Sequence, residues 1–253
     1  MVEYWSTLFP STSMLVVMLL TTAAGATMRA FSGFGSGLLL APVLSLYLPP
    51  TDVVAIVVII NLLGTVQMLP GVWKDIDWQV VWRMVPPALV GVPLGWLLLN
   101  FLDPTAVRRL VSLVVIILAL LLLSGWVYRG ARGRLQDSVA GVSSGMLTGV
   151  AGIGGPPFIL YMLSAPNYTP SSFRTFFTIY FAFAQTFTLA VLLINGALGP
   201  AQFAYAGTLV PVHVLATALG SYLFVKALKN RAHQIKRISL LLLLAVGVLV
   251  LLL

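Results

Sequence analysis

The chain has 253 residues, of which 60% are hydrophobic and 8% charged, and it contains 14 Lys and Arg against 6 Asp and Glu. An ordinary soluble domain carries about 25% charged residues, so this composition excludes a soluble enzyme. It predicts a polytopic membrane protein with residues 1–253 forming a single membrane domain. The absence of cysteine excludes disulfides, thiol catalysis and thiolate-bound metals.

Apolar runs follow one another along the whole chain. They lie at about 14–27, 38–48, 53–69, 80–99, 107–128, 139–150, 157–163, 173–194, 203–225 and 238–253. A helix that crosses a membrane needs about 20 residues, so four of these runs are too short to span alone. The short runs form two pairs, each interrupted by a glycine-rich break, and each pair predicts a helical hairpin.

The two glycine-rich breaks, residues 32–37 (SGFGSG) and 151–157 (AGIGGPP), are 119 residues apart and indicate an internal repeat. Each broken segment is followed by three long spans. Repeat 1 therefore covers about residues 10–128 and repeat 2 about residues 136–253. We predict an all-α polytopic membrane protein in which each half is a broken, re-entrant helical hairpin plus three transmembrane helices.

The basic residues discriminate between two topologies. If each broken segment crosses the membrane, the loops on one side hold five Lys or Arg and those on the other hold eight, which is no clear bias. If each segment is a hairpin that returns to the same face, the split is eleven to two, with Arg108 and Arg109 on the minor side. The second arrangement satisfies the positive-inside rule. It makes the two halves inverted repeats, as in many secondary transporters that work by alternating access.

Non-helical backbone inside a membrane requires a reason, because each unsatisfied polar group costs several kcal/mol unless it faces protein or water. One interpretation is that the two hairpin tips meet near the midplane and present N–H groups to an anion. The alternative is that the glycines only allow close helix packing. The prolines in or after the breaks favour the anion site. Its predicted contacts from the breaks are Ser32, Gly33, Gly35, Ser36, Gly152, Gly154 and Gly155.

Arg29 lies far from any predicted loop, where a charge costs at least about 2.5 kcal/mol. No acidic residue lies at comparable depth, so we predict that Arg29 contacts the transported anion; the alternative is that it snorkels or binds helix-terminal carbonyls. Arg174 follows the second hairpin and either anchors the chain at the positive face or contacts substrate. The remaining polar candidates, each with an interhelical hydrogen bond as the alternative, are Asn61, Gln67, Tyr180 and Gln185.

Catalytic and cofactor sites are not predicted. The acidic residues fall in terminal or loop regions or, for Asp52, at the mouth of a span, and no metal-ligand spacing or Ser/His/Asp set occurs. His213 is interpreted as a satisfied structural histidine, with a proton relay as the alternative. Without an acidic relay, an inside-negative potential still drives an anion outward, at about 2.3 kcal/mol per charge per 100 mV.

The motifs FSGFGSGLLLAPVL and GMLTGVAGIGGPPFILYML, one opening each half, resemble the TauE/SafE sulfite exporter family, also called toluene-sulfonate-uptake permeases. The likeness covers essentially the whole chain, although Pro156 and Pro157 stand where a further glycine is usual. It implies a cell-membrane exporter of sulfite, sulfoacetate or other organosulfonates. The alternatives are an uptake permease for another small organic anion and a non-transport accessory protein. Expected partners are a small anionic substrate, the lipid bilayer and a second copy in a homodimer, but no nucleic acid.

Overall fold

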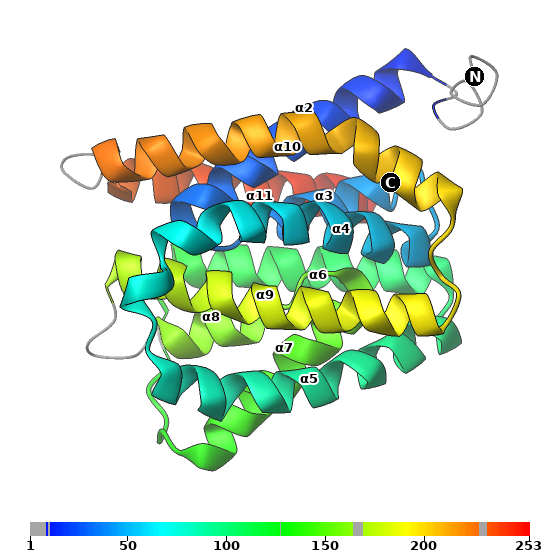
Figure 1. Ribbon diagram of the computed structural model, residues 1–253. Helices are drawn as coiled ribbons and strands as arrows, with labels where there is room; N and C mark the ends of the chain where they lie inside the picture. Colours follow the sequence, from blue (N-terminus) through cyan, green and yellow to red (C-terminus); the bar gives the residue numbers. More distant parts are fainter. Residues whose placement is uncertain (1–8, 10, 127, 164–168, 228–231) are drawn as a thin grey trace.

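The computed structural model describes residues 9, 11–126, 128–163, 169–227 and 232–253, without the side chains of 225–227 and 232–236. Within these ranges the regular structure is helical, which confirms the all-α prediction (Figure 1). The α-helices are α2 (Thr12–Ser32), α3 (Ser36–Leu44), α4 (Pro50–Met68), α5 (Trp78–Phe101), α6 (Pro104–Leu123), α7 (Arg134–Ala151), α8 (Pro156–Met162), α9 (Pro170–Ile194), α10 (Pro200–Ala227) and α11 (Ala232–Leu252). Two 3₁₀ turns, η1 (Leu69–Gly71) and η2 (Trp73–Asp75), join α4 to α5.

Six helices in the described part of the chain are long and apolar enough to cross a membrane, namely α2, α4, α5, α6, α9 and α10. The described side chains of α11 form a shorter apolar helix, Arg237–Leu252. The prediction that the first arm of each hairpin is too short to span is wrong for α2. That helix has 21 residues, or about 32 Å at 1.5 Å per residue, because it continues through the polar residues around Arg29 as far as Ser32.

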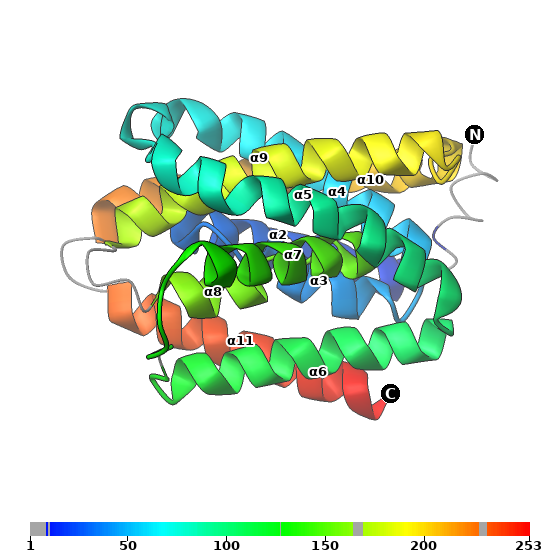
Figure 2. The ribbon, with the colours of Figure 1, turned by 90° about the horizontal axis from the view of Figure 1, so that it is seen from below.

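Each hairpin combines a long first arm with a short return arm. The first arms α2 and α7 end at Gly33 and Gly152, whose φ angles of 86° and 70° lie in the left-handed region that glycine adopts without strain. The return arms α3 and α8 have 9 and 7 residues. Figures 1 and 2 show that each hairpin returns to the end of the molecule where it began, and that the two hairpins begin at opposite ends.

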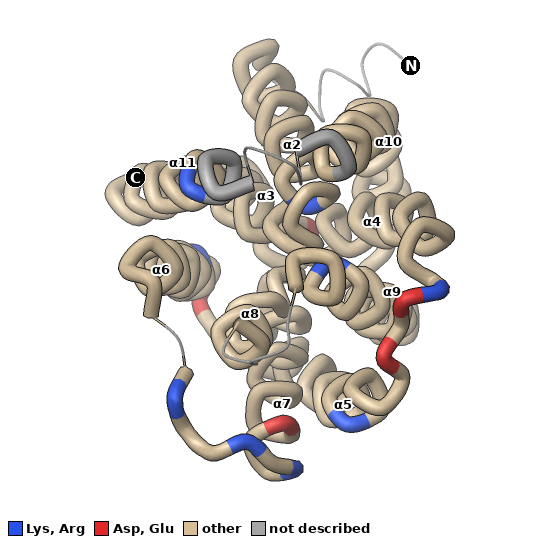
Figure 3. The backbone as a smooth tube through the Cα atoms, turned by 90° about the vertical axis from the view of Figure 1, so that its left-hand side faces the viewer, with Lys and Arg blue, Asp and Glu red and all other residues tan. Residues whose placement is uncertain are grey.

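The three long helices after each hairpin alternate in direction, and α9, α10 and α11 run opposite to α4, α5 and α6, respectively (Figures 1 and 2). One end of the molecule, which faces the viewer in Figure 3, therefore holds the connection 69–77, residues 124–126 and 128–133, and the start of α9. The connection 102–103 lies at the opposite end. Of the eleven basic residues counted for the first end, Lys229 and Arg231 lie outside the described residues.

The two sequence halves interleave rather than forming separate units. The first hairpin packs mainly against the second half, with α2 along α10 and α3 against α11, while α7 packs along α5 and α8 against α6. The end-on view in Figure 3 shows the resulting two layers. We call α2, α3, α4, α10 and α11 the first bundle and α5 to α9 the second bundle. The two bundles meet chiefly where α4 contacts α9 and where α6 contacts α11.

Glycines allow α5 and α7 to approach closely in the second bundle. A Cβ added to Gly145 would stand 1.8 Å from the carbonyl oxygen of Ala88, and one added to Gly149 would stand 2.2 Å from that of Val92. These distances leave no room for a side chain. Small residues at a helix interface are typical of membrane proteins, where van der Waals packing replaces the hydrophobic effect between helices.

We expect Gly145→Ala to destabilise the protein, because its methyl group would force α5 and α7 apart. Overpacking of this kind costs about 1–3 kcal/mol, and each kcal/mol lowers the Tm of a chain of this size by about 2–4 °C. Thermal unfolding in detergent, followed by tryptophan fluorescence, measures the change. Gly207→Ala in α10 is the matched control, because a Cβ there would meet no atom within 4 Å. An equal loss of Tm in the two variants would contradict the packing argument.

Candidate functional site

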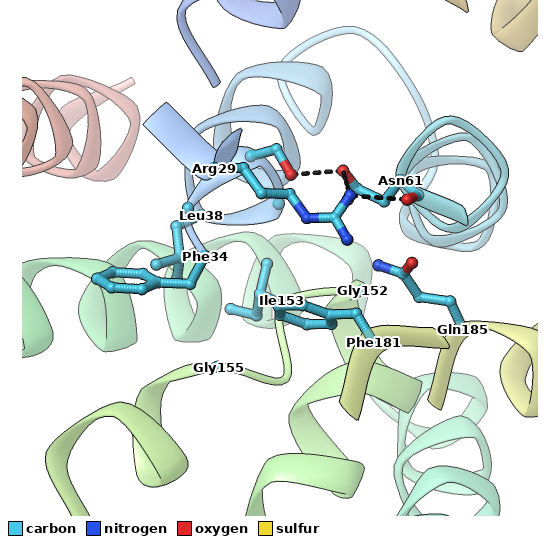
Figure 4. A pocket seen from close by; sticks show the side chains of 12 residues that line it. Arg29, Phe34, Leu38, Asn61, Gly152, Ile153, Gly155, Phe181 and Gln185 are labelled. Carbon is cyan, nitrogen blue, oxygen red and sulfur yellow. Dashed lines mark hydrogen bonds between the residues drawn. The ribbon is translucent and has the colours of Figure 1, made fainter. Parts of the chain in front are cut away.

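The tips of the two hairpins meet between the bundles. A Cβ added to Gly37 in α3 would stand 2.8 Å from the carbonyl oxygen of Gly152, which ends α7. A small pocket, with a cavity volume of about 10 Å³, lies at this junction (Figure 4). It is lined by Arg29, Phe34, Gly35, Ser36, Gly37, Leu38, Asn61, Gly152, Ile153, Gly155, Phe181 and Gln185.

Arg29 of α2 is only 2% exposed and extends toward α4. Its Nη1 donates a hydrogen bond to the carbonyl oxygen of Asn61 at 2.7 Å, and its Nη2 donates to the hydroxyl of Thr65. The guanidinium also lies over the ring of Phe181, 5.1 Å from its centroid. Its Nε is buried and has no hydrogen-bond partner. The guanidinium therefore keeps an unused donor beside the pocket.

The positive charge of Arg29 has no carboxylate partner. Asp137, near the start of α7, instead pairs with Arg83 of α5 at 2.5 Å. The groups that contact Arg29 are neutral: a carbonyl, a hydroxyl and an aromatic ring. A buried charge surrounded only by dipoles is costly, and intramembrane charges normally face a partner or a cavity. An anion in the pocket would supply the missing charge.

Asn61, Thr65 and Gln185 connect the helices around the pocket. The hydroxyl of Ser36 at the start of α3 donates to Oδ1 of Asn61. The hydroxyl of Thr65 lies 3.1 Å from Oε1 of Gln185 across the contact between α4 and α9. Asn61 and Gln185 each lie in the middle third of a long helix. In Figure 4 the amide of Gln185 points toward the guanidinium of Arg29, so two groups of donors face the same space.

The two hairpin tips differ in the backbone donors that they offer. The hydrogen bonds of α3 begin with the N–H of Leu39, which donates to the carbonyl of Gly35 at 3.1 Å. The N–H groups of Ser36, Gly37 and Leu38 precede this ladder at the pocket, and the helix dipole places positive partial charge there.

The second tip offers fewer helix-terminal N–H groups than the first. The first two residues of α8 are Pro156 and Pro157, which have no N–H. The N–H of the third residue, Phe158, donates to the hydroxyl of Ser144 at 3.1 Å. Helix-terminal donors therefore come from the first tip, and the second tip contributes Gly152, Ile153 and Gly155 as a wall of the pocket.

The predicted site residues divide into two groups. Those that line the pocket are Arg29, Gly35, Ser36, Asn61, Gly152, Gly155 and Gln185. Sequence reasoning missed Thr65 and the apolar lining residues Phe34, Leu38, Ile153 and Phe181. Thr65 follows Asn61 by four residues and so shares its helix face, a signal that was available in the sequence. The contact of the lining residues with substrate stays a prediction.

Three of the predicted residues lie outside the pocket lining. Gln67 is exposed, and its amide donates to the carbonyl of Val214 at 3.2 Å. The hydroxyl of Ser32 donates to the carbonyl oxygens of Met28, at 2.8 Å, and Phe34, at 2.7 Å. Gly33 lies against the backbone of α9. These positions shape the end of α2 rather than the pocket.

Arg174, Gly154 and Tyr180 also lie outside the lining and support the tips. The Nε of Arg174 donates to the carbonyl of Ala30 at 2.8 Å, one of the carbonyls in the last turn of α2, where cations are stabilised. Its guanidinium also lies over the ring of Phe224 in α10. The hydroxyl of Tyr180 donates to the carbonyl of Gly154 at 3.1 Å, behind the second tip.

Comparisons with known proteins agree with this architecture. The sequence model of the family described as Sulfite exporter TauE/SafE matches residues 17–250. A protein from Cupriavidus necator, named Probable sulfite/organosulfonate exporter TauE, is 31% identical over 211 residues, which cover 78% of this chain and 79% of that protein. No solved structure matches the chain. With its six apolar helices, the protein is a multi-pass cell-membrane transporter, not an enzyme, and it belongs to the TauE/SafE sulfite exporter family.

Proposed function

We propose that this protein exports small sulfur-containing anions, namely sulfite or organosulfonates such as sulfoacetate, and binds them in the pocket between the two hairpin tips. The observation that carries the proposal is the buried guanidinium of Arg29, which has neutral partners and an unused Nε beside the pocket. The substrate class is supported by the name of the Cupriavidus necator relative. The same pocket would bind the anion whether it is open to the cytoplasm or to the outside.

The chemistry of the lining suits a sulfite or sulfonate group. Such a group has three acceptor oxygens, and charge-assisted hydrogen bonds to them are about twice as strong as neutral ones. Arg29 and the N–H groups of the first turn of α3 supply donors from one side, and the amide of Gln185 supplies them from α9. Phe34, Leu38, Ile153 and Phe181 form apolar walls. These walls would exclude water and accept the short carbon chain of an organosulfonate.

The position of this pocket between the two bundles supports alternating access. Arg29, Ser36 and Asn61 belong to the first bundle, whereas Ile153, Phe181 and Gln185 belong to the second. The opposite directions of equivalent helices support an inverted repeat, in which either end of the molecule can open by the same motion. Rocking of one bundle against the other would expose the anion first to one face and then to the opposite face.

Export is supported by the electrostatics of the membrane. The basic connections gather at one end of the molecule (Figure 3), and the positive-inside rule assigns that end to the cytoplasm. Positive charge at the cytoplasmic mouth raises the local concentration of anions. An inside-negative potential then drives each negative charge outward with about 2.3 kcal/mol per 100 mV.

We expect Arg29→Gln to weaken anion binding and anion efflux without unfolding the protein. The variant loses a hydrogen bond to a charged group, worth about 1.5–3 kcal/mol, which corresponds to roughly a tenfold to hundredfold weaker anion affinity. Because a costly buried charge is removed, its Tm without substrate should equal or exceed that of the unaltered protein. Sulfoacetate efflux from proteoliposomes and the rise in Tm on adding sulfoacetate measure the two effects.

Arg109→Gln is the matched control for this prediction, because Arg109 is an exposed arginine at the start of α6 and lies outside the pocket. It should leave both readouts unchanged. Arg29→Lys should give an intermediate result, since an ammonium keeps the charge but not the planar array of donors. Normal sulfoacetate efflux by Arg29→Gln would remove this residue from the anion site.

The motion of the bundles is testable with a disulfide between α6 and α11. A Cβ added to Gly247 would stand 2.9 Å from Cγ1 of Ile116, so cysteines at 116 and 247 lie within reach of each other. The chain has no native cysteine, so the variant Ile116→Cys/Gly247→Cys forms no competing bond. We expect oxidation to stop efflux, because the disulfide fixes the first bundle to the second.

The controls are the two single-cysteine variants, which should transport equally with and without oxidant, and the reduced double variant, which should recover. Mass spectrometry of the unreduced protein quantifies the cross-linked fraction. A fully cross-linked protein that transports at the reduced rate would show that the contact between α6 and α11 is static during transport.

A further inference from the structure

His213 of α10 is completely buried, and neither of its ring nitrogens has a hydrogen-bond partner. A neutral imidazole carries one N–H donor and one acceptor nitrogen, and buried polar atoms are nearly always paired. The interpretation of His213 as a satisfied structural histidine is therefore wrong. The side chains next to His213 therefore have to explain why a histidine occupies this position.

The guanidinium of Arg29 lies close to His213, and Gly64 of α4 allows the two side chains to come together. A Cβ added to Gly64 would stand 2.4 Å from Nε2 of His213 and 3.3 Å from Nη1 of Arg29. The imidazole and the guanidinium thus converge on the space that a side chain at position 64 would fill. The imidazole lies behind the pocket and shares the first bundle with Arg29.

Other charged and titratable groups around α10 contact it elsewhere. Asp52 in the first turn of α4 accepts a hydrogen bond from Gln202 at 2.7 Å, near the start of α10. Arg174 of α9 reaches α10 at Ser221, two turns beyond His213. The described titratable residues of α10 itself are Tyr205 and Tyr222. Arg29 is therefore the charge that governs whether His213 holds a proton.

We propose that His213 is a proton-binding site that matches the charge of the anion bound at Arg29. This inference rests on the proposed function and adds a specificity device to it. With the pocket empty, the positive charge of Arg29 opposes a second positive charge on the imidazole. A monoanion neutralises Arg29 and leaves His213 neutral. A dianion brings one more negative charge, which is balanced when a ring nitrogen of His213 takes one proton from the solvent.

The proton crosses the membrane with the dianion and is released with it on the other side. The total charge of Arg29, His213 and the bound anion is therefore the same for both kinds of substrate. Sulfoacetate is a dianion near neutral pH, whereas 2-hydroxyethanesulfonate is a permanent monoanion. One pocket would thereby accept both, because the protein rather than the substrate supplies the balancing charge. The device uses no chemistry beyond the reversible protonation of an imidazole, whose ordinary titration lies near physiological pH.

Isothermal titration calorimetry of the purified protein at pH 7.5 tests this directly. Binding enthalpies measured in buffers with different ionisation enthalpies give the number of protons taken up per anion. We expect the unaltered protein to take up about one proton with sulfoacetate and none with 2-hydroxyethanesulfonate. His213→Gln should take up none with either anion. The same variant should bind sulfoacetate about tenfold more weakly, while its affinity for the monoanion stays the same. A tenfold change is the scale expected for losing one charge-assisted contact.

His233→Gln, which alters the other histidine of the chain, is the matched control and should behave like the unaltered protein. If His213→Gln does not fold, as judged by size-exclusion chromatography, Gly64→Ala provides the second test. Its methyl group would displace Nε2 from its place beside Arg29 and should reduce the proton uptake.

Two results would overturn the proposal. The first is sulfoacetate binding to the unaltered protein without proton uptake, and the second is undiminished uptake in His213→Gln, which would place the proton on the carboxylate of the substrate. Both leave the anion site itself intact. Failure of both anions to bind the unaltered protein would instead overturn the proposed function together with this inference.

Discussion

A guanidinium held inside a bundle of apolar helices, with no carboxylate to neutralise it, is the constraint around which the described structure is arranged. The guanidinium of Arg29 in α2 donates hydrogen bonds to the carbonyl of Asn61 and the hydroxyl of Thr65 in α4, and both of these acceptors are uncharged. Dipoles of this kind orient a guanidinium without removing its positive potential. A carboxylate at the same place would have stabilised the empty protein and occupied the position that an anion needs. At Arg29, a change that stabilises the empty protein would therefore lower its affinity for an anion.

Close contact between the hairpin tips makes that arrangement possible. Gly37 and Gly152 meet with no space for a Cβ, and the first arms of both hairpins end in left-handed glycines. Because each hairpin packs against helices of the other half, neither half buries its hairpin alone. The helices that surround the pocket then form two bundles whose boundary passes through the proposed anion site. In the proposed mechanism this boundary serves both binding and movement, so a ligand that contacts both sides would affect how the bundles separate.

The sequence predicted the helical spans, the two hairpins and the deep position of Arg29, because hydropathy, glycine spacing and an isolated charge are local signals. Sequence reasoning failed where a residue's position depends on which face of a helix it occupies or on which distant helices pack together. Gln67 was chosen for its polarity, yet it lies six residues after Asn61 and points away, whereas Thr65 lies four residues after and shares the face. Phe181 and Ile153 line the pocket, but an apolar residue in an apolar chain carries no signal. The interleaving of the halves depends on contacts between helices far apart in sequence, which periodicity does not record.

The same offset of 119 residues that relates the two halves also shows where they differ. Arg29 corresponds to Thr148 and Asn61 to Tyr180, and the hydroxyls of Thr148 and Tyr180 lie 2.9 Å apart behind the second tip. Gly37 and Leu38, whose N–H groups precede the ladder of α3, correspond to Pro156 and Pro157, which have none. Among these paired positions, the positive charge and the helix-terminal N–H groups therefore belong to the first half. Two guanidiniums facing each other across the tips would repel when the pocket is empty and would favour highly charged anions. A single positive charge instead matches a monoanion, and it leaves a dianion in need of one further positive charge, which in our proposal the imidazole of His213 supplies by taking up a proton.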